Sequence, residues 1–448
     1  MKSIGLDIGT TTICGVVTDG ISGKVLATLT LKNDSALIAR DDFSKLQDAL
    51  RIKEICQKIV RDFSEQYKDV VSIGVTGQMH GIVYLDKEGI PVTPLFSWQD
   101  GRANLLYKKG KTYCEYISEK TGYPAASGYG LMTHFYNKEN GLVPKEAVVL
   151  CTIPDYITMF LAGNKRPMMH KSMAASIGLF DVKKGCWDEN ALEILGISKD
   201  ILPDICSDRT NLTTDKTMPD VSPALGDNQA SFVGSVGDDS NVLVNIGTGS
   251  QISIRTSEYH MGELVECRPF LENEYLIVGA PLCGGASYAL LKNFFQSTLS
   301  MFGYKAPENI YEIMNRAAED AEENLENLMV DTRFNGTRKN PKCRGSIQYI
   351  GINNFMPGCF AMALLRGMGQ ELYDIYAEVM ENIETQNIIT GSGNGIRQNP
   401  VLQKELRRLF NKELVIPSFS EEASYGAALF SLYSTGKTTK LMFPESIK

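Results

Sequence analysis

The sequence predicts an α/β protein built from two related domains, and two observations carry this prediction. Residues 6–10 read LDIGT and residues 244–248 read VNIGT, and both motifs lie in apolar, β-branched runs. Between and after them, short apolar strands alternate with segments of helical periodicity, as in a sheet flanked by helices. A strand that turns back through Gly-Thr presents backbone N–H groups and hydroxyls in a concave turn that suits a phosphate. Two such turns predict two related halves facing one nucleotide, as in a phosphotransferase.

Length and composition agree with this division. A chain of 448 residues exceeds one ordinary core, so we expect two domains, residues 1–232 and 233–448. The 45 Lys+Arg against 53 Asp+Glu give a net charge of −8, which excludes a broad basic field and argues against nucleic acid as a partner. No apolar run approaches the ~18 residues of a membrane span. Ten cysteines without a Cys-x-x-Cys motif indicate reduced thiols in a cytoplasmic protein. The oligomeric state stays open, a homodimer included.

The first half shows strand signals, then a helix, then a strand that runs into polar residues. Turn residues at 19–20 and 22–23 separate the first apolar runs. Apolar residues at helical spacing then predict a helix. Residues 120–225 carry turn signals without a strong period. The expected elements are strands over 3–17 and 24–31, a helix over 43–63 and a strand over 70–75.

The second half restarts at Asn241 with a strand run that mirrors the beginning of the chain. Residues 421–428 (EEASYGAA) begin a helix with small residues on one side, and small residues let two helices approach closely. The other expected helices span 286–302, 310–328, 360–383 and 399–410.

Asp7 lies in the first Gly-Thr motif, where a carboxylate beside a phosphate is unfavourable unless a cation intervenes. We therefore predict that Asp7 holds Mg²⁺ through water, because Mg²⁺ keeps its water ligands. The second motif carries Asn245 at this position, so only the first half brings the negative charge. The alternative is that Asp7 merely caps the turn.

Glycine-rich turns predict the nucleotide contacts. Residues 389–395 (ITGSGNG) follow an apolar stretch and precede a helix, so their backbone could approach adenine and ribose where no Cβ intervenes. Gly285 lies in a further glycine turn that could face the phosphates. The alternative is a set of ordinary glycine-rich turns. The predicted ATP contacts are Thr10, Thr11, Thr12, Gly247, Thr248, Gly285, Gly391, Gly393 and Asn394.

Asp227 opens a helix after an apolar approach, in residues 224–230 (ALGDNQA). Phosphoryl transfer to an alcohol needs a group that accepts the hydroxyl proton, and we predict that Asp227 is this general base. A position at a helix N-terminus favours the ionised form of the carboxyl group. The alternative is that Asp227 is only a helix cap.

Two polar segments predict a sugar or polyol site. Residues 78–80 (QMH) follow a strand, and residues 98–102 read WQDGR. Amide, carboxylate, imidazole and guanidinium groups supply the directed donors and acceptors that a polyol needs, and an indole face suits its C–H side. The alternatives are a structural role for His80 and core packing for Trp98. The predicted sugar contacts are Gln78, Met79, His80, Trp98, Gln99, Asp100, Arg102, Asp227 and Asn228.

The order of these motifs resembles that of the FGGY carbohydrate kinases, in the actin-like ATPase superfamily, over essentially the whole chain. The resemblance implies two actin-like/ribonuclease H-like domains with a central cleft, ATP and Mg²⁺ as cofactors, and catalysis by Asp227. Within the family it is strongest to the subfamily that phosphorylates the terminal hydroxyl of the ketose sedoheptulose. The alternatives are xylulose or another sugar or polyol as substrate, and a non-catalytic sugar or nucleotide sensor. The segments that carry the resemblance are 7–12, 77–81, 98–102, 224–227, 247–249, 391–394 and 422–428.

Overall fold

The structure, a computed structural model, describes residues 1–39, 41–337, 340, 342–380, 383 and 386–442. Its contacts divide the chain into two compact units. The first holds Met1–Ser235, Arg268–Glu274 and the C-terminal helix from Glu421 onward, and the second holds Val236–Cys267 and Tyr275–Ser420. A single boundary at residue 232 does not describe this division, because two later segments return to the first unit.

The first unit is built on a five-stranded sheet in the order β14-β6-β1-β2-β3. β1 is antiparallel to β2 and parallel to β6, and β14 is parallel to β6. The strands predicted at the start of the chain are confirmed, but residues 3–17 form two strands joined by the Gly-Thr turn. The strands are β1 (Lys2–Ile8), β2 (Thr12–Asp19), β3 (Val25–Lys32), β6 (Val70–Gly77) and β14 (Asp220–Val221).

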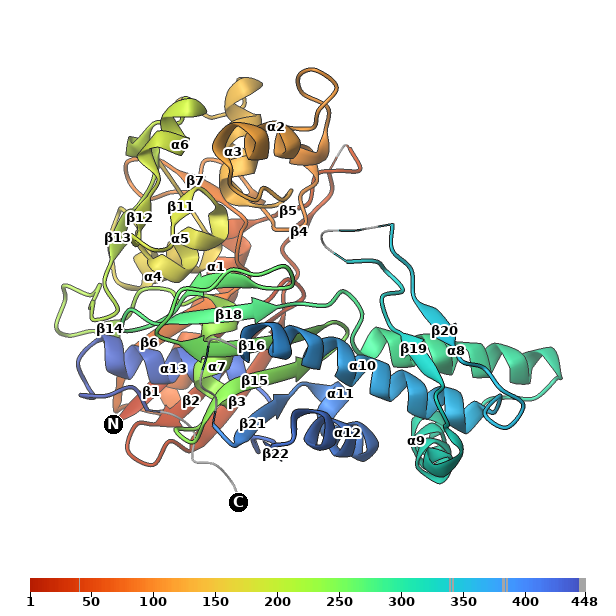
Figure 1. Cartoon of the computed structure of the whole chain (residues 1–448). Coiled ribbons are helices and arrows are strands. Elements are labelled where there is room, and N and C mark those ends of the chain that lie inside the picture. The colour runs from red at the N-terminus through yellow and green to blue at the C-terminus, as the bar shows by residue number, and fades with distance from the viewer. Residues whose placement is uncertain (40, 338–339, 341, 381–382, 384–385, 443–448) are drawn as a thin grey trace. The chain divides into compact units, whose positions relative to one another are not determined.

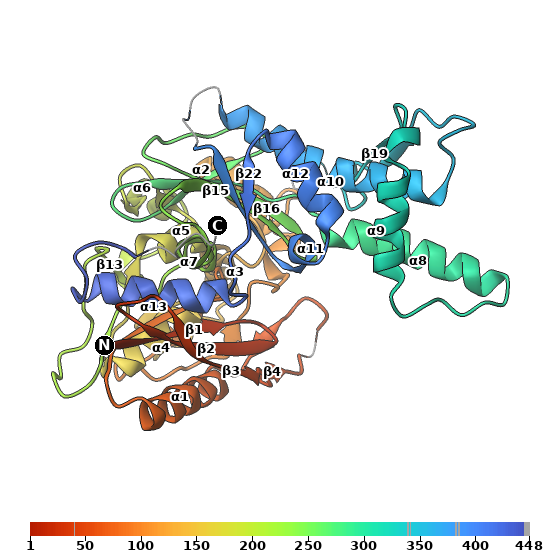
Figure 2. The same ribbon diagram turned by 90° about the horizontal axis from the view of Figure 1, so that it is seen from below.

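Two helices cover the opposite faces of this sheet, α1 (Ala49–Gln66) and α13 (Glu422–Ser434) (Figure 2). Covering on both faces explains why residues 3–6 and 8 of β1 are all buried, on both sides of the strand. α1 begins later than the sequence predicted, because the Asp48 side chain accepts hydrogen bonds from the N–H groups of Leu50 and Arg51 and fixes the helix start there.

α13 lies close against both the sheet and α7 (Asp227–Ser235). A Cβ on Gly5 would lie 1.8 Å from the carbonyl oxygen of Ser424, so only glycine fits at this position of β1. Between the helices, a Cβ on Gly426 would lie 1.9 Å from the carbonyl oxygen of Ala230. The predicted close approach through small residues is thus confirmed, and it fixes the helix that begins with Asp227.

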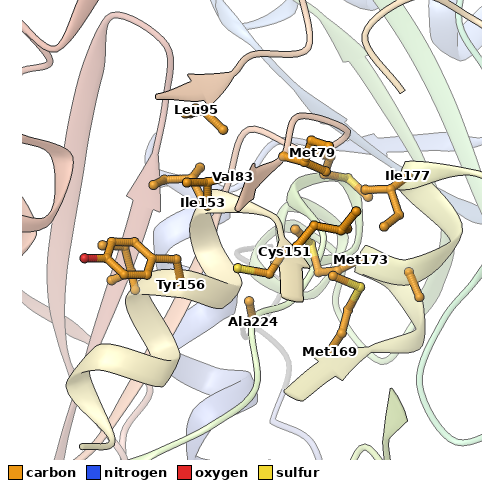
Figure 3. Close-up of a cluster of buried hydrophobic side chains, with 14 of the residues drawn as sticks. Met79, Val83, Leu95, Cys151, Ile153, Tyr156, Met169, Met173, Ile177 and Ala224 are labelled. Carbon is orange, nitrogen blue, oxygen red and sulfur yellow. The ribbon is translucent and has the colours of Figure 1, made fainter. Parts of the chain in front are cut away.

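The remaining elements of the first unit are short, and their buried apolar side chains continue the core cluster of the sheet (Figure 3). The helices are α2 (Tyr113–Thr121), α3 (Gly130–Glu139), α4 (Ile153–Leu161), α5 (Lys171–Ile177) and α6 (Glu189–Ile194). The strands are β4 (Ala36–Leu37), β5 (Leu46–Gln47), β7 (Val83–Leu85), β8 (Leu95–Phe96), β9 (Val149–Cys151), β10 (Met168–His170), β11 (Phe180–Asp181), β12 (Cys186–Trp187) and β13 (Asp204–Cys206).

The second unit repeats the topology of the first sheet. Its strand order is β17-β18-β16-β15-β21-β22, in which β15 is antiparallel to β16 and parallel to β21. β15 therefore corresponds to β1, β16 to β2 and β21 to β6, as the repeated Gly-Thr motif predicted. The strands are β15 (Ser240–Ile246), β16 (Ser250–Thr256), β17 (Glu266–Pro269), β18 (Tyr275–Gly279), β21 (Ile388–Ser392) and β22 (Glu413–Val415).

The helices predicted for the second half are present. The helix predicted over 310–328 ends at Asp320, and residues 381–382 at the end of the helix predicted over 360–383 lie outside the described residues. α8, α9 and the β19–β20 pair lie together beside α10 (Figure 1). The bounds are α8 (Gly285–Met301), α9 (Ile310–Asp320), α10 (Pro357–Met380), α11 (Asn394–Arg397), α12 (Pro400–Phe410), β19 (Met329–Asp331) and β20 (Ser346–Gln348).

All ten cysteines are free thiols. In the part of the chain that the structure describes, no helix combines the length and the apolar character needed to cross a bilayer.

Candidate active site

Three segments that carry predicted site residues end at the same edge of the first sheet. β1 and β6 are parallel and pair Ile8 with Gly77. Beyond β14 the chain continues along β6, where the hydroxyl of Thr76 donates to the carbonyl oxygen of Leu225 (2.7 Å). α7 follows at once, so Asp227 reaches the edge where β1 and β6 end. The carboxyl ends of parallel strands are where α/β sheets bind ligands.

Carboxylates gather at this edge. Burial, and to a lesser degree the negative charges of Asp227 and Glu421, together raise the pKa of Asp7 to about 7. Glu421 precedes α13 and is not among the predicted site residues, because residues 421–428 predicted a helix start and the family resemblance covered 422–428 without assigning a contact there. Like charges held this close favour either a bound proton or a bound cation.

Asp227 lies beside a positive charge that the sequence analysis missed, Arg268. Burial raises the pKa of Asp227 above its ordinary value, while Arg268 and the backbone N–H of Asn228 act in the opposite sense. The prediction that the helix N-terminus favours ionised Asp227 took no account of burial, which has the larger effect on the pKa and raises it. A carboxylate whose pKa is raised is a better proton acceptor near neutral pH. The side chain of Asn228 is buried in the same turn of α7.

The turn between β1 and β2 is held by side chains from outside it. Trp98 Nε1 donates to the hydroxyl of Thr10 (3.0 Å), and Gln47 Nε2 donates to the Thr10 carbonyl oxygen (3.1 Å). Thr10 is partly exposed, and Thr11 and Thr12 are exposed. The three predicted phosphate contacts are therefore accessible.

Gln78 and Met79 point to different surroundings. Gln78 Nε2 donates to Gln47 Oε1 (2.7 Å), whereas Gln78 Oε1 is buried without a hydrogen-bond partner among the described residues. Such an acceptor requires a donor, and a sugar hydroxyl would supply one. Met79 lies in the apolar cluster near Ile177, away from these polar groups (Figure 3).

His80 is held in an unusual conformation. Its φ of 76° is in the left-handed region, and its ring stacks on that of Tyr129 at 4.6 Å. Nδ1 lies 2.6 Å from the carbonyl oxygen of Ser176, which only accepts, so Nδ1 carries the proton. Backbone strain of this kind costs about 1–3 kcal/mol and is common at functional sites. Tyr129 had no signal in the sequence.

Segment 98–102 divides into an exposed and a buried part. Trp98 is 45% exposed, so it is not packed in the core, and Gln99 is exposed as well. Asp100 and Arg102 are buried and bonded to each other, with Arg102 Nε 2.6 Å from Asp100 Oδ1. Arg102 Nη1 also donates to Asn137 Oδ1 (2.5 Å). The structure thus places the indole and the amide at the surface and the ion pair beneath them.

In the second unit, the second Gly-Thr turn contacts the start of α8. The N–H of Gly285 donates to the Gly247 carbonyl oxygen (2.9 Å), and the N–H of Gly284 donates to that of Thr248 (3.2 Å). A Cβ on Gly285 would lie 2.5 Å from the Gly247 oxygen, so glycine allows this approach. Thr248 is exposed.

The glycine-rich loop lies at the carboxyl end of β21, next to the end of β15. Gly391 is buried in β21, and Gly393 has a φ of 82° and would place a Cβ 2.4 Å from the Ile246 carbonyl oxygen. Asn394 begins α11 and is exposed. The predicted nucleotide contacts of the second unit thus follow the parallel strands of one sheet.

The described residues contain no group of three or more His, Cys, Asp or Glu side chains that could enclose a metal ion.

The two halves of the sequence match the two domains of one protein family. Residues 3–245 match the N-terminal domain of the FGGY family of carbohydrate kinases, and residues 242–435 match its C-terminal domain. The chain belongs to the FGGY family of carbohydrate kinases. Membership makes it a carbohydrate kinase with two α/β domains of actin-like/ribonuclease H-like type, as the resemblance implied.

This FGGY kinase is 26% identical to the sedoheptulokinase of Mus musculus over 473 residues, which cover 96% of this chain and 97% of that protein. It is 25% identical to the xylulose kinase of Staphylococcus xylosus, covering 96% and 90% of the two chains. The crystal structure of Plasmodium falciparum glycerol kinase with ADP has the same fold, with a TM-score of 0.79 and 18% identity over 98% of this chain and 90% of that one.

Proposed function

We propose that this FGGY kinase transfers the γ-phosphoryl group of ATP to the terminal hydroxyl of a ketose, sedoheptulose, giving sedoheptulose 7-phosphate. The observation that carries the transfer is the position of Asp227, whose pKa burial raises, at the strand edge that also carries Asp7. The choice of sugar is supported by the sedoheptulokinase of Mus musculus, which is similar over nearly its whole length.

The first unit would bind the sugar and move its proton. Asp227 would accept the hydroxyl proton as the oxygen attacks phosphorus. Before the transfer, the positive charge of Arg268 would stabilise the ionised form of the buried Asp227. The exposed indole of Trp98 would support the C–H face of the sugar, and Gln78 Oε1 would accept from a hydroxyl. Asp100 and Arg102 would fix the loop that presents Trp98 and Gln99.

We assign the nucleotide contacts to the glycine-rich turns. The related glycerol kinase, whose crystal structure was solved with ADP, supports an adenine nucleotide as the phosphoryl donor. Asp7 fits Mg²⁺, since it offers a hard oxygen donor whose ionised form its neighbours disfavour without a cation, and Mg²⁺ takes its remaining ligands from water and phosphate. When bound, Mg²⁺ would offset the charge of the phosphates. We retain a cytoplasmic location in this proposal, as free thiols are usual there.

A sugar panel tests the substrate. We expect kcat/KM to be highest for sedoheptulose among sedoheptulose, xylulose, gluconate, ribulose and glycerol, measured by ADP release with mass detection of the phosphorylated product. A higher kcat/KM for xylulose would assign the xylulose kinase activity that the Staphylococcus relative favours. No product with any sugar would leave the non-catalytic sensor as the better interpretation.

The proposed base is tested by Asp227→Asn, which keeps the size of the side chain and removes its basicity. We expect kcat to fall by about 10²–10⁴-fold, the usual contribution of general base catalysis. The Kd for ATP, measured by calorimetry, should stay within about threefold, since the nucleotide contacts are assigned to other residues. An Asp227→Asn variant with wild-type kcat would show that another group takes the proton.

A further inference from the structure

A hydrogen-bonded series of three side chains, two of them buried and the third partly buried, lies behind the proposed base. β10 and β13 are parallel and pair His170 with Cys206, so His170 and the following Asp208 come to the same end of this two-stranded sheet. His170 Nε2 lies 2.7 Å from Asp208 Oδ1, and His170 Nδ1 lies 2.7 Å from Ser172 Oγ. His170 and Ser172 are buried, and the ring of Phe430 meets the imidazole edge-on at 5.7 Å.

The direction of these hydrogen bonds follows from the donors at either end. The N–H of Ser172 donates to His170 Nδ1 (3.2 Å), so Nδ1 is an acceptor. Nε2 therefore carries the proton of the neutral ring and donates a hydrogen bond to Asp208 Oδ1. Burial lowers the pKa of His170, which keeps the imidazole neutral, although Asp208 acts in the opposite sense. Every polar side-chain atom of Ser172, His170 and Asp208 has a hydrogen-bond partner, as a rigid network requires.

At one end of this series of side chains, Ser172 holds the loop that carries Asp227. The N–H of Gly226 donates to Ser172 Oγ (3.0 Å), immediately before the proposed base. A Cβ on Gly226 would lie 2.3 Å from Gln229 Oε1 and 2.8 Å from the terminal methyl of Met79, so a side chain at this position would have to displace both groups. The Ser172 hydroxyl therefore fixes the backbone where its position affects Asp227 directly.

At the other end of this series, Asp208 holds the hairpin that carries Arg268. The N–H of Glu272 donates to Asp208 Oδ2 (2.8 Å), and Glu272 itself has a φ of 51°. The same hairpin is bonded to α7, because Gln229 Nε2 donates to the Pro269 carbonyl oxygen (2.8 Å). Asp208 thus joins the segment of the positive charge to the segment of the carboxylate.

We propose that Ser172, His170 and Asp208 are positioning residues that hold the Asp227 loop and the Arg268 hairpin in register, so that base and cation keep their relative position during phosphoryl transfer. The role in transfer rests on the proposed function, whereas the mechanical coupling does not. Ser, His and Asp also make up hydrolytic triads, but here the Ser172 hydroxyl is buried and receives the Gly226 N–H, so it is not offered to a substrate.

Hydrogen exchange of the full chain without ligand tests the coupling. Ser172→Ala removes the acceptor of the Gly226 N–H, so exchange in peptides covering 222–230 should rise at least threefold while 268–274 stays unchanged. Asp208→Asn leaves one acceptor oxygen for His170 Nε2 and the Glu272 N–H, and it also removes the charge that pairs with Lys171 Nζ (3.5 Å), so exchange should rise in 268–274 as well. Ser431→Ala is the matched control, a buried hydrogen-bonded serine of α13, and it should change neither segment. Equal exchange in Ser172→Ala, Asp208→Asn and the control would overturn the proposal.

Kinetics with the best sugar of the panel test the consequence for transfer. Ser172→Ala and Asp208→Asn should each lower kcat by about tenfold to hundredfold and change KM for ATP by less than twofold, whereas a general loss of structure would lower the active fraction and leave kcat per folded molecule unchanged. A kcat equal to that of Ser431→Ala would overturn the positioning role. A wild-type chain that phosphorylates no sugar would refute the proposed function instead, and the exchange experiment would still decide the coupling.

Discussion

At the scale of single residues, the ion pair of Asp100 and Arg102 shows why a polar segment is hard to interpret from sequence. Three polar residues and a tryptophan in the five positions 98–102 predicted a sugar site, but only Trp98 and Gln99 are exposed. Arg102 Nε and Nη2 both donate to the Asp100 carboxylate, and the guanidinium also lies 4.2 Å from the ring centre of Phe96. The pair neutralises itself below the surface, which spacing alone does not reveal.

Arg102→Ala should destabilise the protein by about 3–5 kcal/mol, because it leaves the Asp100 carboxylate buried without its counter-charge. Urea denaturation gives the free energy of unfolding. Arg333→Ala is a matched control, since Arg333 also pairs in bidentate fashion with an aspartate two residues earlier but is 46% exposed. Its loss should cost at most about 1 kcal/mol. Equal costs for the two variants would contradict the argument from burial.

Asp155 gives a pH dependence with a definite sign. It is buried in α4, its Oδ2 accepts from the Thr152 hydroxyl (2.6 Å), and burial raises its pKa to about 7. Between about pH 4 and pH 7 the folded state therefore holds a proton that the unfolded state has lost, so stability falls as the pH rises through this window. The fall amounts to about 3–4 kcal/mol for a fully buried group. Denaturation at pH 4.5, 6 and 8 should show a shallower fall for Asp155→Asn than for the wild type, and parallel curves would contradict this prediction.

At the scale of elements, the contact of α13 with α7 links packing to the site. Alanine is the better helix former, so propensity alone predicts that Gly426→Ala stabilises the protein by about 1 kcal/mol. The contact predicts the opposite sign, since the new Cβ would lie 1.9 Å from the Ala230 carbonyl oxygen and overpacking costs about 1–3 kcal/mol. Thermal denaturation decides the sign. We also expect a lower kcat, because α7 begins with Asp227.

The elements that could be predicted are those with a local signal. The Gly-Thr repeat located the central strands of both sheets. α8 and α12 were predicted to within one residue at each end, whereas α1 was predicted to begin at residue 43 and begins at Ala49. Residues 120–225 had no clear period because their helices are short, such as the seven-residue α5, and are buried on most sides. Arg268 and Glu421 were missed because they reach the site from segments distant in sequence, through tertiary contacts that no local pattern contains.

At the scale of the whole molecule, two sheets of the same topology carry different chemistry. In the first sheet Asp7 pairs with Thr76 of β6, and in the second Asn245 pairs with Ser392 of β21 at the corresponding position. Asn245 Nδ2 donates to the Ser392 hydroxyl (2.7 Å), so the second unit has a satisfied neutral pair where the first has a carboxylate. The repeat predicted the shared topology, and the Asp-to-Asn difference predicted which half would carry the charge.

The return of the chain's last helix to the first unit has a consequence for dissection of the molecule. A fragment of residues 1–235 lacks α13, so the sheet face around Gly5 and Gly74, shaped for the backbone of that helix, would be open to water. We expect this fragment alone to lack cooperative unfolding by circular dichroism and to bind a hydrophobic dye. Adding a peptide of residues 421–442 should restore a cooperative transition, whereas a peptide with Gly426→Leu should not, because the larger side chain would collide with α7. A fragment 1–235 that unfolds cooperatively without the peptide would show that the first unit is complete without its C-terminal helix.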